Sequence, residues 1–222
     1  MAGLDDPFAL RADALSVRVS EYDEDCSEGY NEDDYYLTKG VYYTQPSPTQ
    51  PPFRTFCDMR LRGRSRIMAK GTFWIGNELL HHVTNSRRQT LIIEATIPEL
   101  GYRQYFYYGF VVKSEEEGYA FTYDRGGPSN DHPLGDILLV NGTKFSTYDV
   151  DNDLSADNCA DIHKSGWWFT TCGGYNPTGQ PQPLSDQFMS SDPTSLSWPI
   201  AGNLSIPYLR MFLTNGLVER HG

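Results

Sequence analysis

The chain has 222 residues, a length that suits one large domain or two small ones. Its net charge of −11 argues against a nucleic-acid-binding protein, which needs a basic surface, and is typical of an acidic protein or one with cation sites. Fourteen prolines and twenty glycines indicate a loop-rich α+β or β-rich fold. No stretch approaches the roughly 20 apolar residues that a membrane-spanning helix needs.

Four cysteines, Cys26, Cys57, Cys159 and Cys172, allow three disulfide connectivities. The pairs Cys26–Cys57 and Cys159–Cys172 close the shortest loops, and each would stabilise the fold by about 3–4 kcal/mol on the chain-entropy model. Four free thiols in a cytosolic protein are the alternative. Two glycosylation triplets, which begin at Asn141 and Asn203, favour a secreted, extracellular glycoprotein. The first residues lack the pattern of a signal peptide, so we expect a secreted form to carry its targeting signal upstream.

The amino-terminal part predicts an extension followed by a hairpin. Residues 1–25 are polar and acidic and predict an N-terminal extension outside the core. Residues 40–45 and 53–59 are rich in aromatic and β-branched side chains, and a proline-rich turn separates them, which is the pattern of two strands. Residues 60–70 are basic and weakly patterned, and we expect a solvated loop there.

Further along the chain, residues 73–86 predict a turn and a short helix, with Asn77 as a candidate N-cap. His81 and His82 on this helix are adjacent and face different ways, so they are a poor chelating pair.

Three strand-like runs follow, and short connections between them favour an antiparallel meander. They are residues 90–97, 102–113 and 118–124. Alternating aromatic residues in the second run predict packing on one face of a sheet. Residues 124–136 are rich in glycine and predict a surface loop, and residues 205–214 predict a closing strand.

The most informative segment carries oxygen-bearing side chains on alternate positions: Asp149, Asp151, Asp153, Ser155 and Asp157. Crowded carboxylates repel one another unless a hard cation neutralises them, and Ca²⁺ takes six to eight oxygen ligands in flexible loops. An EF-hand is excluded, because its sixth and twelfth positions need glycine and glutamate, whereas Leu154 and Ala160 stand there. An acidic solvated loop that binds nothing is the alternative.

Several motifs together resemble the fibrinogen-like C-terminal domain family, which includes ficolins, tachylectins, angiopoietins and tenascins. They are LTKGVYYTQP and PFRTFCDMR, then FWIGNELLHHVT, then FSTYDVDNDLSADNCADIHKSGWWFTTC. The last is the most specific, and the resemblance covers roughly residues 25–180. It implies an α+β fold with a small N-terminal disulfide subdomain (26–59), a central and mainly antiparallel sheet (71–140) and a loop-rich calcium and ligand-pocket subdomain (141–222).

The resemblance also implies site residues. Calcium in this family is bound by the side chains corresponding to Asp151 and Asp153 and by the main-chain carbonyls corresponding to Ser155 and Asp157, so Asp149 is not expected to contact the ion. Lectin members have an adjacent pocket for acetyl groups, which here corresponds to His163, Thr171, Cys172, Gly173 and Tyr175. A cis peptide bond is expected there between Thr171 and Cys172.

The chain departs from the family pattern at three places. Gly173 stands where lectin members usually carry histidine, and His163 stands where many carry an aromatic residue. The stretch between Met59 and Phe73 is short, which predicts the loss of a strand and a helix and an exposed sheet edge. The usual close of the family is reduced, with Trp198 as its remnant.

These observations lead to two functional hypotheses. The first is a secreted, calcium-binding, lectin-like module that binds acetylated or other carbohydrates in recognition of the innate-immune type. The alternative is a protein-binding signalling or matrix module without sugar binding. No catalytic motif is present, so we expect no enzyme. Weak sugar contacts gain from avidity, and an oligomerising segment would have to lie outside this chain.

Overall fold

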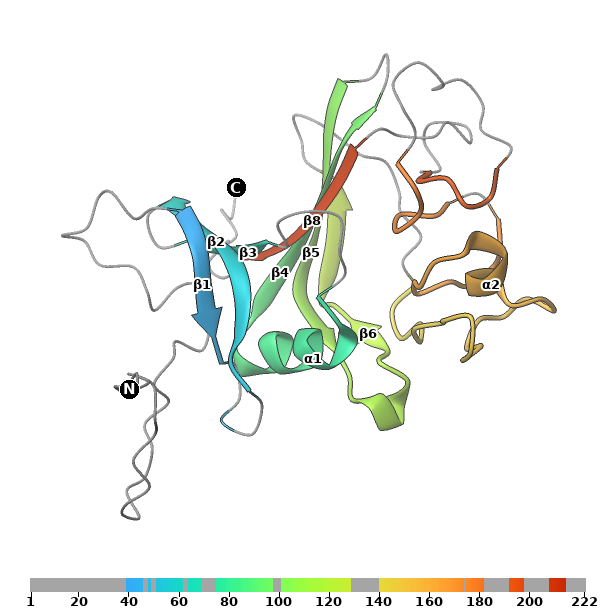
Figure 1. Cartoon of the computed structure of the whole chain (residues 1–222), viewed down its shortest axis with the longest axis horizontal. Coiled ribbons are helices and arrows are strands. Elements are labelled where there is room, and N and C mark those ends of the chain that lie inside the picture. The colour runs from blue at the N-terminus through green and yellow to red at the C-terminus, as the bar shows by residue number, and fades with distance from the viewer. Residues whose placement is uncertain are drawn as a thin grey trace, which may run out of the picture.

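The computed structural model describes residues 39–45, 48, 51–61, 64–68, 75–97, 101–128, 140–173, 175–181, 192–197 and 208–214. The predicted N-terminal extension, Cys26, Trp198 and Asn203 lie outside these residues. The described strands form one eight-stranded sheet, in which β1, β2, β3, β8, β4, β5 and β6 are successive neighbours and β7 pairs with β5. Figure 1 shows helix α1 beside this sheet and a loop-rich region around α2 at one side of it.

The predicted hairpin is confirmed. Strand β1 (Lys39–Thr44) pairs antiparallel with β2 (Phe53–Leu61), with Gly40 opposite Cys57. The expected loop at residues 60–70 is wrong, because β3 (Arg64–Met68) lies there and pairs with both β2 and β8. On both of its sides β3 is paired, so the sheet continues through this stretch, and the loss of a strand and a helix relative to the family pattern stays a prediction. Backbone pairing on both sides makes Arg64–Met68 a strand although its side-chain pattern is weak.

The predicted antiparallel meander is confirmed in β4 (Gln89–Ile97) and β5 (Gly101–Val112), but the third run is mostly not a strand. Within that run, β6 (Phe121–Thr122) is the part that pairs with β5. A 3₁₀ turn, η1 (Glu115–Glu117), and left-handed residues at 118 and 119 precede it and interrupt the extended backbone. The glycine-rich stretch expected to be a loop begins with β7 (Arg125–Pro128), which pairs with β5.

A bulge at Gly109 sets which aromatic side chains of β5 face the core. Tyr105 and Tyr107 are buried on alternate positions, and the buried residues then shift to Phe110 and Val112. Gly109 has φ +64, and a Cβ built there would lie 2.0 Å from Asp124 Oδ2. Glycine at the bulge lets the strand skip one residue, so both halves of β5 present their apolar side chains to the same core.

Strand β8 (Tyr208–Thr214), the predicted closing strand, lies between β3 and β4 in the middle of the sheet. Its neighbour Glu94 on β4 is buried, and Arg210 of β8 and Tyr102 of β5 both contact its carboxylate. Gln104 Nε2 donates a third hydrogen bond at 3.2 Å. A charge needs such partners when it is removed from water, and here they come from both neighbouring strands.

Helix α1 (Asn77–Ser86) packs on the sheet through Leu80 and Val83. The N-cap position is Gly76 with φ +96, and no side chain caps it, so the prediction that Asn77 caps the helix is wrong. Thr84 Oγ1 accepts the Val112 N–H at 2.9 Å, which ties the helix to β5. No helix among the described residues is long and apolar enough to cross a membrane.

An aromatic cluster joins the loop-rich region to the sheet. Trp168 is 1% exposed and meets Phe110, Phe121 and Phe145 edge-on, with centroids 5.2–6.0 Å apart. Its Nε1 donates to the Tyr119 carbonyl at 2.8 Å. The region that carries the aspartates is therefore anchored to the core by a buried side chain.

Candidate metal centre and ligand pocket

A disulfide and a short helix shape the loop that carries the aspartates. The predicted bond between Cys159 and Cys172 is present, with their Cα atoms 4.7 Å apart, whereas Cys26, the predicted partner of Cys57, lies outside the described residues. Helix α2 (Cys159–His163) begins after Asn158, whose Oδ1 accepts the Asp161 N–H at 3.0 Å. Asparagine is a favoured N-cap residue, so the sequence itself favours a helix start at this point.

The two sides of the loop are joined by backbone hydrogen bonds. Ser146 and Trp167 exchange N–H···O bonds of 2.9 and 3.2 Å, and the Leu154 N–H donates to the Thr170 carbonyl at 3.0 Å. Asn152 Nδ2 donates to the Phe145 carbonyl at 2.7 Å. These bonds hold an irregular segment in one shape without a ladder of strands.

The predicted metal ligands lie in the middle of this loop. Asp153 accepts the Ser155 N–H on Oδ1 at 2.8 Å and the Cys159 N–H on Oδ2 at 2.9 Å. Asp151 Oδ1 accepts the Asp153 N–H at 3.2 Å. Asp149 is turned to Thr147, whose hydroxyl donates to its Oδ1 at 2.7 Å. The backbone thus orients two carboxylates, at 151 and 153, in one turn of the loop.

The donor set fits a hard cation. A carboxylate oxygen that accepts one N–H still has a free lone pair, and the segment at residues 151–157 has no helix or strand that would occupy its carbonyls. Ca²⁺ accepts such mixed carboxylate and carbonyl sets. A carboxylate oxygen of Asp153 and the sulfur atoms of Cys159 and Cys172 lie within 4.8 Å of one another. Disulfide sulfur is not a ligand for a hard cation, so this group shows only how close the carboxylate lies to the bridge.

The predicted pocket residue His163 is buried at the end of α2. It is 5% exposed, and its ring stacks on Phe169 with centroids 5.1 Å apart. Its Nδ1 lies 2.7 Å from the Pro193 carbonyl oxygen and its Nε2 lies 3.2 Å from the Cys172 carbonyl oxygen. Asn176, which is fully buried, donates to the His163 and Pro193 carbonyls at 3.1 Å each.

The other predicted pocket residues differ in exposure. Thr171 and Gly173 are exposed, Cys172 is half-buried, and Tyr175 is buried against Phe169. Burial raises the pKa of the Tyr175 phenol. The expected cis bond between Thr171 and Cys172 is wrong, because every peptide bond of the described residues is trans. A trans bond satisfies the general preference of non-proline residues, which here no tertiary contact overrides.

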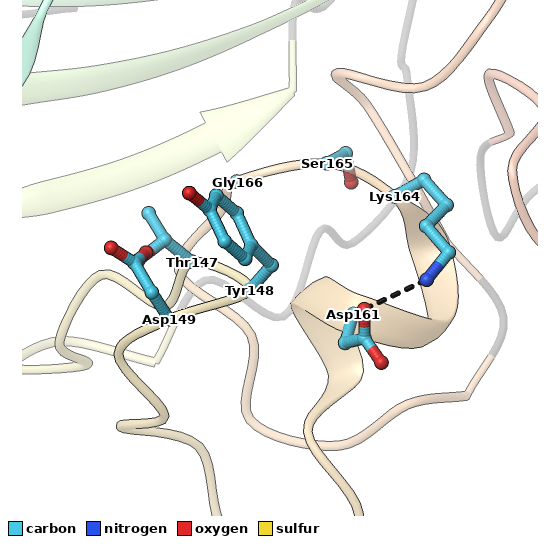
Figure 2. A pocket seen from close by; sticks show the side chains of 7 residues that line it. All are labelled: Thr147, Tyr148, Asp149, Asp161, Lys164, Ser165 and Gly166. Carbon is cyan, nitrogen blue, oxygen red and sulfur yellow. Dashed lines mark hydrogen bonds and ion pairs between the residues drawn. The ribbon is translucent and has the colours of Figure 1, made fainter.

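A cavity of about 500 Å³ lies beside α2, and none of the predicted pocket residues lines it. It is lined by Thr147, Tyr148, Asp149, Asp161, Lys164, Ser165 and Gly166. Figure 2 shows the Tyr148 ring between Asp149 on one side and Asp161 and Lys164 on the other. The sequence gives little sign of this cavity, because Tyr148 and Lys164 belong to no alternating pattern and are brought together only by the folding of the loop.

The predicted glycosylation position Asn141 is exposed on a turn beside β6. Its side chain exchanges two hydrogen bonds with the backbone of Tyr123, at 3.0 and 3.3 Å. Among the described residues, the exposed position of Asn141 leaves its side chain open to solvent on one side.

Fold and site together define a class: an antiparallel sheet that carries a disulfide-closed loop with oxygen donors, typical of extracellular binding domains. The family model of the C-terminal globular domain of fibrinogen beta and gamma chains matches residues 62–211. The chain therefore belongs to the fibrinogen C-terminal family.

Three relatives in the same family share between 28% and 31% of their aligned residues with this chain. Human fibrinogen-like protein 1 is 28% identical over 189 residues, which cover 70% of this chain and 60% of that protein. Human microfibril-associated glycoprotein 4 is 28% identical over 203 residues, covering 77% of this chain and 76% of that protein. Bovine angiopoietin-related protein 7 is 31% identical over 182 residues, which cover 70% of this chain and 51% of that protein. The chain thus spans between half and about three quarters of the length of these relatives.

Solved structures of the family share the fold. The fibrinogen-like globe domain of human ANGPTL2 matches with a TM-score of 0.71 and 22% identity, covering 86% of this chain and 98% of that chain. Lamprey fibrin D-dimer in complex with the peptide ligand Gly-His-Arg-Pro amide matches with a TM-score of 0.72 and 20% identity. The match covers 95% of this chain and 81% of that chain.

Proposed function

We propose that this chain is a secreted, calcium-binding recognition module that binds acetylated carbohydrates and has no enzymatic activity. One observation carries the proposal: a short chain of contacts connects the metal loop to the predicted pocket. Asp153 accepts the Cys159 N–H, Cys159 is bridged to Cys172, and the Cys172 carbonyl faces His163. A cation at Asp151 and Asp153 would hold this chain of contacts in place, because it neutralises the two carboxylates.

Calcium would act structurally in this proposal. Its ligands would be the side chains of Asp151 and Asp153 and the carbonyls of Ser155 and Asp157, and it would stabilise the segment that ends at Cys172 and Gly173. These two residues, with the exposed Thr171, form the accessible part of the predicted pocket. Tyr175 and His163, which are both buried, would pack behind this accessible part and stabilise it.

The decisive experiment measures retention on an acetylated resin, with calcium, with a chelator and with free N-acetylglucosamine. We expect retention in calcium and release by either the chelator or the free sugar. Asp151→Ala and Asp153→Ala should abolish retention, and Glu116→Gln, an exposed acidic position on η1, is the matched control. Retention that ignores both calcium and free sugar would contradict the lectin-like function.

A protein-binding function is the second candidate, and the burial of His163 favours it. Both ring nitrogens already face carbonyl oxygens, so this side chain has little capacity left for a sugar. The peptide-bound lamprey fibrin shows that the same fold accommodates a peptide ligand. Capture of a protein partner that persists in excess N-acetylglucosamine, and that Gly173→Arg abolishes, would support this function over the first.

A further inference from the structure

We propose that the cavity beside α2 is a second binding site, specific for a primary ammonium group such as that of an amino sugar or a lysine side chain. We call it the ammonium pocket, defined by Thr147, Tyr148, Asp149, Asp161, Lys164, Ser165 and Gly166. It shares no residue with the calcium ligands or with the acetyl pocket proposed above, so it stands apart from that function.

The walls of the ammonium pocket are held in place from both ends. At one end Asn158 Nδ2 donates to the carbonyls of Thr147 and Tyr148 at 3.0 and 3.3 Å, while its Oδ1 caps α2. At the other end the paired hydrogen bonds between Ser146 and Trp167 fix the residues next to Thr147 and Gly166. A ligand would therefore find a largely pre-formed cleft, which lowers the entropy cost of binding.

The charges in the pocket favour a cation. Asp161 forms an ion pair with Lys164, with Lys164 Nζ 2.7 Å from Asp161 Oδ1. Among the described residues, the contact found for the Asp149 carboxylate is the Thr147 hydroxyl, which carries no charge. One negative charge thus remains in the pocket of a chain whose net charge is −11. An anionic ligand would be repelled, and an ammonium would form a charge-assisted hydrogen bond.

The Tyr148 ring adds a second attraction for the same group. It is 75% exposed, an unusual position for a large aromatic side chain, and in Figure 2 it stands between Asp149 and the Asp161–Lys164 pair. The face of an aromatic ring attracts a cation, and its apolar surface can pack on the carbon skeleton that carries the ammonium. The Asp149 carboxylate would therefore bind the ammonium of the ligand, and the Tyr148 ring would pack on the carbon skeleton that carries it.

Lys164 ends helix α2 on the wall of the ammonium pocket. Lys164 has φ +50 and ψ +41 as the C-cap of α2, a left-handed conformation that glycine or asparagine adopts at lower cost. It pairs with Asp161 at the surface, which leaves Asp149 as the carboxylate available to an ammonium.

The test is a titration of the chain with D-glucosamine in an amine-free buffer, followed by the backbone amide NMR signals of Tyr148, Ser165 and Gly166. We expect these signals to shift with glucosamine and to stay unchanged with glucose and N-acetylglucosamine, which lack the ammonium. Asp149→Asn should weaken binding about tenfold or more, the scale of a charge-assisted hydrogen bond. Tyr148→Ala should weaken it as well, and Tyr148→Phe, which keeps the ring, should retain it.

Controls separate this site from the proposed calcium-dependent function. Glu116→Gln removes the same charge outside the pocket and should leave glucosamine binding unchanged. Nα-acetyl-lysine methylamide tests the second source of an ammonium, and a tighter response to it than to glucosamine identifies a peptide ligand. Equal affinity of the wild type and Asp149→Asn, an equal response to glucose, or no response to either amine would overturn the proposal.

Discussion

The central sheet and the loop-rich region from Val140 to Gln180 are stabilised in different ways. In the sheet, β4 is paired along its whole length with β5 and from Thr90 to Thr96 with β8, and one face carries the buried side chains of Leu91, Ile93 and Ile97. Among its described residues, the loop region has one five-residue helix, and it is held by separate hydrogen bonds, a disulfide and buried aromatic side chains such as Trp168. Both regions bury apolar side chains, but the sheet adds continuous backbone pairing, whereas the loop region adds one disulfide and separate hydrogen bonds that can each be removed.

The largest effect is expected where the two regions meet. Trp168→Ala removes a side chain that is 1% exposed and that links the loop region to Phe110 and Phe121 of the sheet. We expect a loss of about 3–5 kcal/mol in the free energy of unfolding, the usual range for a large core aromatic. Urea denaturation checks this. A loss below 1 kcal/mol would show that the two regions are stabilised separately.

Removal of the disulfide tests the loop region alone. Cys159→Ala combined with Cys172→Ala opens a loop of sequence separation 13 and should cost about 3 kcal/mol. Hydrogen exchange should show lost protection at residues 151–173, while β4 and β5 keep theirs. Equal loss in both regions would contradict a division of the molecule into two stabilised parts.

Calcium should act on the same region in the opposite direction. At about 100 times its dissociation constant, the ion should add roughly 2.7 kcal/mol to the free energy of unfolding. The thermal midpoint with and without calcium measures this, and Asp153→Ala should remove the increase. An unchanged midpoint in the wild type would mean that the aspartates form a solvated loop without a metal.

A smaller effect is expected inside the sheet. Arg210→Met removes a partner of the buried Glu94 carboxylate but leaves Tyr102 and Gln104 in contact with it. A hydrogen bond to a charged group contributes about 2 kcal/mol, so we expect a loss of that size by urea denaturation. Glu94→Gln combined with Arg210→Met should recover part of it, because no charge is then left buried.

The smallest effect concerns alkaline pH. Burial and then the Glu78 carboxylate raise the pKa of Tyr119 from 10.0 to about 12. The folded state therefore holds this proton more tightly than the unfolded state, and the stability that it contributes below pH 10 is lost between pH 10 and 12. Tyr119→Phe lacks this contribution, so its stability should fall less steeply over that range. Denaturation curves at several alkaline pH values check this, and identical slopes would contradict it.

The disulfide loop was easier to predict than the sheet around it, while its calcium ligands stay a prediction. Asp151, Asp153 and the bond between Cys159 and Cys172 lie within one short segment, so their spacing alone indicates a compact loop. Strand β3 was missed, because Arg64–Met68 has little side-chain pattern and pairs with residues far along the chain. The cavity beside α2 was missed for a similar reason, since Tyr148 and Lys164 meet only through the hydrogen bonds of Asn158 and Ser146.

By itself, the sequence determined the family, the hairpin, the meander of β4 and β5 and the disulfide of the loop region, since each depends on residues close together or on a local pattern. Only the tertiary structure decided the place of β8 in the middle of the sheet, the bulge at Gly109 and the burial of His163. These features arise from pairing and packing between distant segments, and local preferences do not encode which distant partner a segment will meet.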